Sequence, residues 1–245
     1  MEFNIKLLFV ITSMVLNFNA AAKEKISLLA PYDEWYFNFF YPNSLPAEVT
    51  YVELLDTDGI YYQFRTLAST NASPGSVGQW SEKVSGMSSV FNKAKNPPMS
   101  IHFCWDSVID KKVYETWITL AGDVWKLMLT PYSPPGGGSE KYYLRYLLIG
   151  LAPEGKIGVW LEKPDKPNIR LTDKQILIET VSGEKMEMCN GRSAYKHGYS
   201  YPESTKNFIK DKKYPYGNWG NDSNLLIVFY VQIMPDDLVM QLHRF

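Results

Sequence analysis

Alternating apolar and polar residues mark the middle of the chain, between Pro97 and Leu161. Residues 100–107 place Ile101, Phe103 and Trp105 on one side and mixed residues on the other. Successive side chains of a strand point to opposite faces, so this spacing predicts a strand with one apolar face. Residues 114–120 repeat the alternation after a polar turn, which predicts an antiparallel hairpin.

The same signal continues on both sides of this hairpin. Strands are expected over these ranges: 35–41, 46–55, 60–65, 142–151, 156–161, 175–179 and 225–231. The last of these is the most apolar, which favours a central place in a sheet. We expect residues 185–189 to pair back on the strand that precedes them.

Helical periodicity is confined to short stretches. Val124, Leu127 and Met128 fall on one helical face, and Pro131 ends the pattern. Residues 85–95 and a segment starting at Pro235 are two more candidates. Residues 68–86 are expected to form a surface loop held by one buried side chain, Trp80. The prediction is a mainly β protein with antiparallel, sandwich-like sheets and two or three short helices, or an α+β protein if the helices prove larger.

The N-terminus has the three-part pattern of an export signal. Lys6 precedes an apolar run over residues 7–16, and three alanines follow at residues 20–22. This predicts a signal peptide over residues 1–22 and one mainly β domain over residues 23–245, with no transmembrane segment in the mature chain. An uncleaved N-terminal membrane anchor is the alternative.

Composition narrows the classes of partner. The formal net charge is −1, and neither sign clusters. Nucleic acids and anionic membranes attract a basic face, so neither is an expected partner. The two cysteines, Cys104 and Cys189, would be exported into an oxidising compartment, where they form either one disulfide or two separate buried thiols.

No pattern of residues predicts an active site, a metal site or a cofactor. The three histidines, His102, His197 and His243, have no partner at a metal-ligand spacing. His102 and Asp106 lie on one face of a predicted strand. Any two residues an even number of positions apart in a strand share a face, so this arrangement does not by itself indicate a site. We interpret them as part of a polar outer face.

An aromatic segment over residues 195–219 is the predicted binding site for a partner. Tyrosine and tryptophan give a large contact area at a small entropy cost, and loops on a rigid scaffold often carry recognition. The alternative is a long loop that packs its aromatic side chains onto its own sheet. The candidate partner-binding residues are Tyr195, Tyr199, Tyr201, Tyr214, Tyr216 and Trp219.

Two stretches resemble the bacterial domain-of-unknown-function 2931 family. The first comprises residues 98–101, 105–107 and 114–115, and the second is the Ile-Gly-Leu-Ala-Pro-Glu-Gly-Lys-Ile-Gly-Val-Trp-Leu string of residues 149–161. The resemblance implies export, to the periplasm or envelope of a Gram-negative bacterium. Members are often lipoproteins, whereas this leader lacks the cysteine that would carry a lipid. Some members lie beside type VI secretion effector genes and look like immunity proteins.

Three functions remain open at this point. The first is an exported, non-enzymatic binding protein with a protein partner, such as an immunity protein that neutralises a secreted toxin. The second is a β-sandwich that binds carbohydrate or another envelope component through exposed aromatic side chains. The third is a hydrolase whose site would be assembled from distant residues, for instance a pocket that holds His102 or His197 beside a carboxylate or serine.

Overall fold

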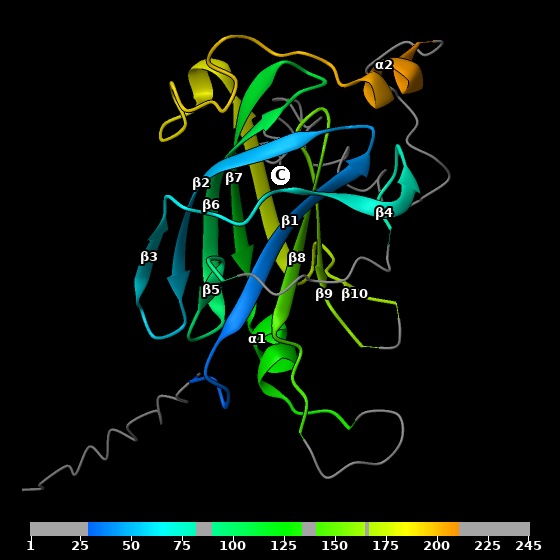
Figure 1. Ribbon diagram of the computed structural model, residues 1–245. Helices are drawn as coiled ribbons and strands as arrows, with labels where there is room; N and C mark the ends of the chain where they lie inside the picture. Colours follow the sequence, from blue (N-terminus) through cyan, green and yellow to red (C-terminus); the bar gives the residue numbers. More distant parts are fainter. Residues whose placement is uncertain (1–28, 82–89, 134–140, 165–166, 211–245) are drawn as a thin grey trace, which may run out of the picture.

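Two β-sheets pack face to face in the computed structural model, which describes residues 29–81, 90–133, 141–164 and 167–210 (Figure 1). Sheet A contains β1 (Trp35–Asn43), β4 (Asn71–Val77), β5 (Lys93–Ala94), β8 (Tyr146–Ala152), β9 (Lys156–Leu161) and β10 (Ile169–Arg170). Sheet B contains β2 (Ala47–Asp56), β3 (Tyr61–Phe64), β6 (Pro98–Ser107), β7 (Lys112–Leu120) and β11 (Ile176–Ser182).

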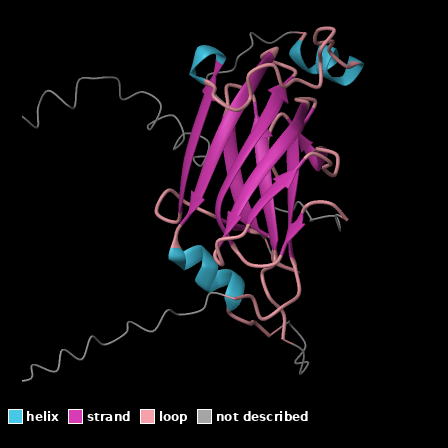
Figure 2. Cartoon of the chain, turned by 90° about the vertical axis from the view of Figure 1, so that its left-hand side faces the viewer, coloured by secondary structure: helices cyan, strands magenta, loops and turns pink. Residues whose placement is uncertain are grey.

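Short helices lie beyond the ends of the strands. Figure 2 shows α1 (Gly122–Leu129) at one end of the sandwich and α2 (Glu203–Ile209) at the other. A single 3₁₀ turn, η1 (Gly183–Lys185), follows β11. The predicted mainly β sandwich with two or three short helices is therefore confirmed. None of the helices in the described ranges has the length and apolar character that crossing a bilayer requires.

Sheet B follows directly from the alternation in the sequence. Its strands pair antiparallel in the order β11-β7-β6-β2-β3. The expected hairpin is β6 and β7, with Trp105 opposite Tyr114 and Ile101 opposite Ile118. These side chains all point toward sheet A and are buried, so the apolar face of the hairpin forms one wall of the core.

Sheet A is mixed, and so only sheet B matches the expectation of antiparallel sheets throughout. β1 runs parallel to both of its long neighbours, β4 and β8. The chain leaves sheet A after β1 and returns only after strands of sheet B, and such a crossover allows a strand to re-enter in the same direction. β8 and β9 form an antiparallel hairpin and overlap two of the ranges where the sequence predicts strands.

The core between the sheets is largely aromatic. Phe39 of β1 and Phe103 of β6 meet across the two sheets with their ring centroids 5.0 Å apart. Trp105 is fully buried, and its Nε1 donates a hydrogen bond to the Thr116 hydroxyl at 3.0 Å. Aromatic side chains bury large areas when their polar atoms find partners, so this packing stabilises the contact between the sheets.

A second apolar cluster covers the outer face of sheet A. Trp80 is buried against Trp160, and its Nε1 donates to the Leu151 carbonyl at 3.4 Å. This confirms that Trp80 holds its loop on the sheet. A Cβ added at Gly150 would lie 2.9 Å from both tryptophans, so a glycine is required for their close approach.

Three local predictions are wrong. Residues 71–77 were expected in a loop but form β4, because pairing with β1 outweighs their low strand propensity. Residues 185–189 do not pair back; η1 ends at Lys185 and backbone N–H groups of the next residues bond to a side chain of β7. Residues 90–95 hold β5 in place of a helix. The predictions for residues 1–22, 85–89, 225–231 and the segment from Pro235 lie outside the described residues.

Candidate functional site

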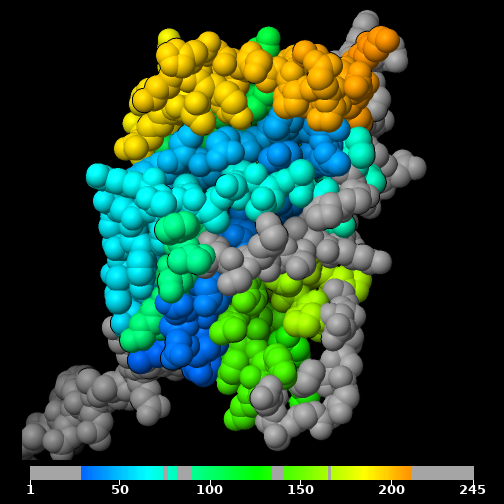
Figure 3. All heavy atoms as spheres, viewed as in Figure 1, coloured from blue at the N-terminus to red at the C-terminus, as the bar shows by residue number. Residues whose placement is uncertain are grey.

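Residues 186–210, here called the strap, cross one end of the sandwich from sheet B to sheet A. Figure 3 shows this segment, yellow to orange, covering the ends of the strands. At its far end α2 packs against the outer cluster of sheet A, and Thr205 donates to the Ser44 carbonyl at 2.9 Å. The strap therefore joins the two sheets.

A buried carboxylate of β7 holds the near end of the strap. Because Tyr114 and Thr116 face the core, Glu115 points outward, yet the strap buries it completely. Its Oε2 accepts the backbone N–H groups of residues 187–189 at 2.9, 3.0 and 2.9 Å. Its Oε1 accepts a hydrogen bond from Nε2 of His102 at 2.8 Å, because an ionised carboxylate has only acceptors.

A disulfide joins the strap to the sheet at the same place. Cys104 of β6 and Cys189 of the strap are bonded, with their Cα atoms 5.4 Å apart. The structure thus selects the bridge over two separate thiols. The Cys189 N–H also donates to Glu115, so a covalent and a charge-assisted contact hold the same residue.

A second buried carboxylate holds the middle of the strap. Asp106 of β6 is fully buried and accepts hydrogen bonds from the Ser193 hydroxyl at 2.7 Å and the Ala194 N–H at 2.9 Å. The Tyr199 hydroxyl donates to the same carboxylate. Burial, followed by this hydrogen bond to Asp106, raises the pKa of Tyr199 well above its usual value.

The predicted partner-binding tyrosines divide into two groups. Tyr195, Tyr199 and Tyr201 are half-buried, and the Tyr201 hydroxyl donates to the Ile109 carbonyl at 3.0 Å. The alternative interpretation, in which the segment packs its aromatic side chains onto its own sheet, describes Tyr199 and Tyr201. Their contact with a partner stays a prediction. The other three candidates, Tyr214, Tyr216 and Trp219, lie outside the described residues.

The strap leaves part of the outer surface of sheet B uncovered, here called the open face. Two rows of neighbouring side chains form it, each crossing all five strands. Large apolar groups are exposed there: Tyr61 is 55% exposed and Leu177 is 64% exposed. The first row is Gln63, Glu53, His102, Trp117 and Glu179, and the second is Tyr61, Leu55, Ser100, Thr119 and Leu177.

The centre of the open face is held in place by stacking and hydrogen bonds. The ring of Trp117 stacks on His102 with centroids 4.3 Å apart and planes 19° apart. Burial acts to raise the pKa of Glu53, but hydrogen bonds, including one from Tyr51 at 2.8 Å, outweigh it and lower that pKa. Glu53 therefore presents a charge beside His102, whose Nδ1 lies 3.9 Å from it.

The arrangement of His102 also bears on hydrolysis. Its contact with Glu115 resembles the histidine–carboxylate half of a catalytic triad. However, Glu115 is already bonded to three backbone N–H groups of the strap, so its position serves the structure of that segment. In the ranges that the structure describes, no group of three histidine, cysteine or acidic side chains is arranged to hold a metal ion.

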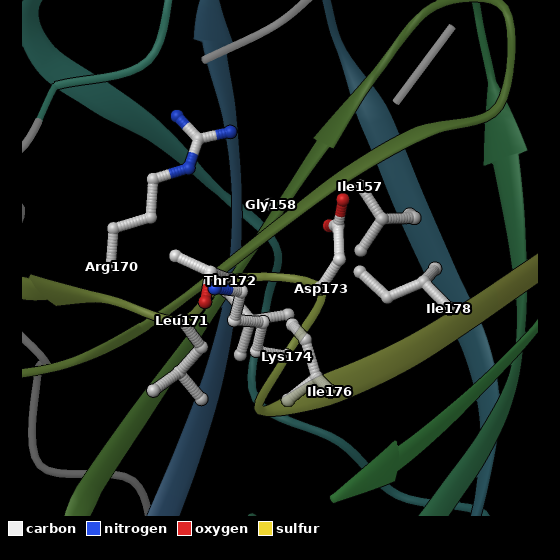
Figure 4. A pocket seen from close by; sticks show the side chains of 10 residues that line it. Ile157, Gly158, Arg170, Leu171, Thr172, Asp173, Lys174, Ile176 and Ile178 are labelled. Carbon is white, nitrogen blue, oxygen red and sulfur yellow. The ribbon is translucent and has the colours of Figure 1, made fainter. Parts of the chain in front are cut away.

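A cavity of about 430 Å³ opens on the other side of sheet B, at the edge of the sandwich. Ile157 and Val159 of β9 line one wall, and Ile176 and Ile178 of β11 line the other. Figure 4 shows Arg170 at the end opposite Ile178. This cavity is separated from His102 by the sheet itself, so the two do not form one site.

The position of Trp117 in the sequence was a signal for the open face, but the alternating pattern alone did not distinguish it from its neighbours. Trp117 alternates with Thr116 and Ile118, which face the core, and it therefore falls on the polar side of its strand. Trp117 is half-buried there, a large aromatic side chain on the outer face of the sheet among polar neighbours. Such residues are enriched where proteins bind partners.

Comparison with known proteins gives one match. The model of a family described as a protein of unknown function (DUF2931) matches residues 19–217. This range includes every strand and helix described above and therefore the strap as well. No curated protein and no solved structure matches the chain.

Proposed function

This chain belongs to the DUF2931 family of proteins of unknown function, and we propose that it is an exported, non-enzymatic binding protein of the cell envelope. The open face is the observation that carries the proposal. It combines exposed Tyr61 and Leu177 with Trp117, whose ring is fixed by stacking on His102. Aromatic side chains that are already ordered lose little entropy on binding and supply much of the energy at protein interfaces.

The anchoring of the strap supports the same proposal. Glu115 and Asp106 are both fully buried and both accept several hydrogen bonds from the strap. Together with the disulfide, these contacts make sheet B a firm base for recognition. In this account the two carboxylates fix the geometry of the surface and take no part in a reaction.

The finer form of the proposal concerns the partner. We propose that it is a type VI secretion effector that the protein neutralises in the periplasm. The support is the resemblance stated above, in which some family members lie beside effector genes. The open face fits this role because its aromatic and apolar groups are interspersed with the charges of Glu53 and Glu179, as is common at specific interfaces.

A growth-protection experiment tests this function. The full chain, with its predicted leader, is produced in a Gram-negative host together with the product of each gene adjacent to its own, directed to the periplasm. Protection by the wild type and its loss in Trp117→Ala, at equal protein levels, is the expected result. Tyr142→Ala is the matched control, because Tyr142 is 39% exposed and lies in the loop after α1. Failure of the wild type to protect, or full protection by Trp117→Ala, would contradict the proposal.

Carbohydrate binding is the second candidate, and the aromatic side chains of the open face favour it. Trp117 of β7 and Tyr61 of β3 lie on the same outer surface of sheet B, with β6 and β2 between their strands, and a sugar ring can stack on an aromatic ring. A glycan array separates the two candidates. Binding of one glycan class that disappears in Trp117→Ala favours carbohydrate, whereas no glycan binding together with growth protection favours a protein partner.

A further inference from the structure

In the described part of the chain, β11 is an edge strand of sheet B, and Glu179 is its one charged residue. It pairs with β7 in an unbroken register from Ile176 to Ser182, and in the described part of the chain no strand pairs with its other edge. Its sequence, Ile-Leu-Ile-Glu-Thr-Val-Ser, contains no proline and no lysine, and its register shows no bulge. Edge strands usually carry one of these features, because an unpaired edge is a template for another strand.

The direction of the backbone groups along β11 follows from one hydrogen bond. The Ala121 N–H donates to the Gln175 carbonyl at 2.8 Å, and these residues are opposite each other in the continued register. Bonded and non-bonded pairs alternate in an antiparallel ladder. Leu177 and Glu179 therefore bond to β7, whereas Ile178 and Thr180 direct their N–H and C=O groups away from β7, to the open edge.

The side chains of the same residues point into the sandwich. Ile176 and Ile178 line the cavity of about 430 Å³, opposite Ile157 and Val159 of β9. Leu171 lines it as well, in the connection that runs from β10 to β11 (Figure 4). Outward-facing backbone groups of β11 thus lie beside a cavity whose lining is mainly apolar and also includes the charged residues Asp173 and Lys174.

We propose that β11 receives an extended segment of a partner protein as an additional strand of sheet B. The free groups of Ile178 and Thr180 would bond to the backbone of that segment. Its apolar side chains, at every second position, would enter the cavity against Ile157 and Val159. Backbone bonds supply affinity and side-chain pockets supply specificity in this mode of recognition.

The geometry selects a strand over other occupants. An acyl chain would use the apolar cavity but leave the N–H and C=O groups at the edge without partners. A strand uses both, because its side chains and backbone groups alternate with the same period of two. This proposal deepens the proposed function, and it rests on that function for the assumption that the occupant belongs to a protein partner. A strand added at this edge would extend the open face beyond Leu177.

A synthetic peptide tests the edge without the natural partner. The probe is acetyl-Thr-Val-Thr-Val-Thr-Lys-amide, and its control has the same composition with the two valines adjacent. We expect the alternating peptide to bind and to slow hydrogen exchange at the amides of Ile178 and Thr180. We expect no comparable effect from the control peptide, because its valines cannot both face the cavity.

Two substitutions at one position separate the backbone from the side chain. Thr180→Pro removes the outward N–H, and an edge strand tolerates proline where the N–H faces solvent. Thr180→Val keeps that N–H and loses the same hydroxyl contact with Thr116. We expect the proline variant to bind the peptide about tenfold more weakly and the valine variant to bind within about twofold of the wild type.

Substitutions on opposite faces of β11 test the cavity independently. Ile178→Phe fills the cavity and keeps the outward N–H, so it should weaken binding, whereas Leu177→Phe points to the open face and should not. Equal peptide affinity in Thr180→Pro and Thr180→Val, or no protection of the edge amides, would overturn the proposal. Self-association of the protein that protects the same amides without peptide would also overturn it, in favour of a second copy. Growth protection that depends on Trp117 would survive each of these outcomes.

Discussion

The carboxylate of Glu115 joins two parts of the molecule that are distant in sequence, because its Oε1 lies 2.8 Å from Nε2 of His102 while it also holds residues 187–189. One end of this network is the strap and the other is the stacked pair of His102 and Trp117 on the open face. The position of the binding surface therefore depends on the anchoring of the strap.

Replacing Glu115 with glutamine should destabilise the protein. The amide keeps the shape of the carboxylate but loses its charge, and its NH₂ group cannot accept the backbone N–H groups. Loss of a buried, multiply bonded charge predicts a decrease of about 3 kcal/mol in the free energy of unfolding, measured by chemical denaturation. Glu179→Gln, at an exposed position of the open face, is the matched control and should change stability by less than about 0.5 kcal/mol. Equal stability of the two variants would show that the network is not needed to hold the strap.

Removing the disulfide should have an effect of similar size. The disulfide joins Cys104 to Cys189, which are 85 positions apart in the sequence, and so closes a long loop. In the chain-entropy model a loop of this length contributes about 4 kcal/mol. We expect the double variant Cys104→Ala/Cys189→Ala to unfold at a lower denaturant concentration than the oxidised wild type and to be insensitive to reductant. A wild type whose unfolding midpoint is unchanged by full reduction would contradict this.

Tyr199→Phe should change the pH dependence of stability in the alkaline range. Burial and the bond to Asp106 raise the pKa of Tyr199 above the ordinary value of 10.0. Because the folded state favours the protonated phenol, this contribution is complete below pH 10.0 and is lost as the pH rises toward the folded pKa. The variant should therefore be less stable by about 1 kcal/mol near neutral pH, and the difference should narrow in strong alkali. A constant difference at all pH values would rule out this linkage.

The tryptophan pair on sheet A predicts a sharp difference between two glycines. A Cβ at Gly150 would lie 2.9 Å from Trp80 and from Trp160, so Gly150→Ala should cost about 2 kcal/mol in thermal unfolding. Gly122 lies at the start of α1, where the nearest atom to an added Cβ is 4.0 Å away. Gly122→Ala should leave stability unchanged or slightly raise it. A reversed order would mean that the packing around Trp80 is looser than described.

Local patterns were sufficient to predict much of the fold. The hairpin of β6 and β7, the turn between β8 and β9, and the burial of Trp105 all follow from the period of two and from turn residues close in sequence. The strap was not predictable in the same way. The Cys189 N–H donates to Glu115 and the Tyr199 hydroxyl donates to Asp106. Alternation cannot show which distant donor groups will meet a given carboxylate.

The alternating pattern of the sequence did not predict the parallel pairing of β4 with β1, and it did not predict the open face of sheet B. The sequence of β4 is poor in strand-forming residues, and only the backbone of β1 beside it explains its conformation. The aromatic segment after residue 194 was predicted to bind a partner because of its composition. In the structure the Tyr199 hydroxyl donates to Asp106 of β6, and the Tyr201 hydroxyl donates to the Ile109 carbonyl in the turn between β6 and β7. The exposed aromatic side chain Tyr61 lies instead on the open face of sheet B.

Titration of the purified protein with the partner protein proposed above, sought among the products of the genes adjacent to its own, is the most direct test of the open face as the binding surface. Calorimetry gives the dissociation constant for the wild type, Trp117→Ala and the control Tyr142→Ala. We predict that Trp117→Ala weakens binding by at least about tenfold, because truncation of a central aromatic contact costs more than about 1.4 kcal/mol, and that Tyr142→Ala binds like the wild type. Equal affinities for all three proteins would contradict the account.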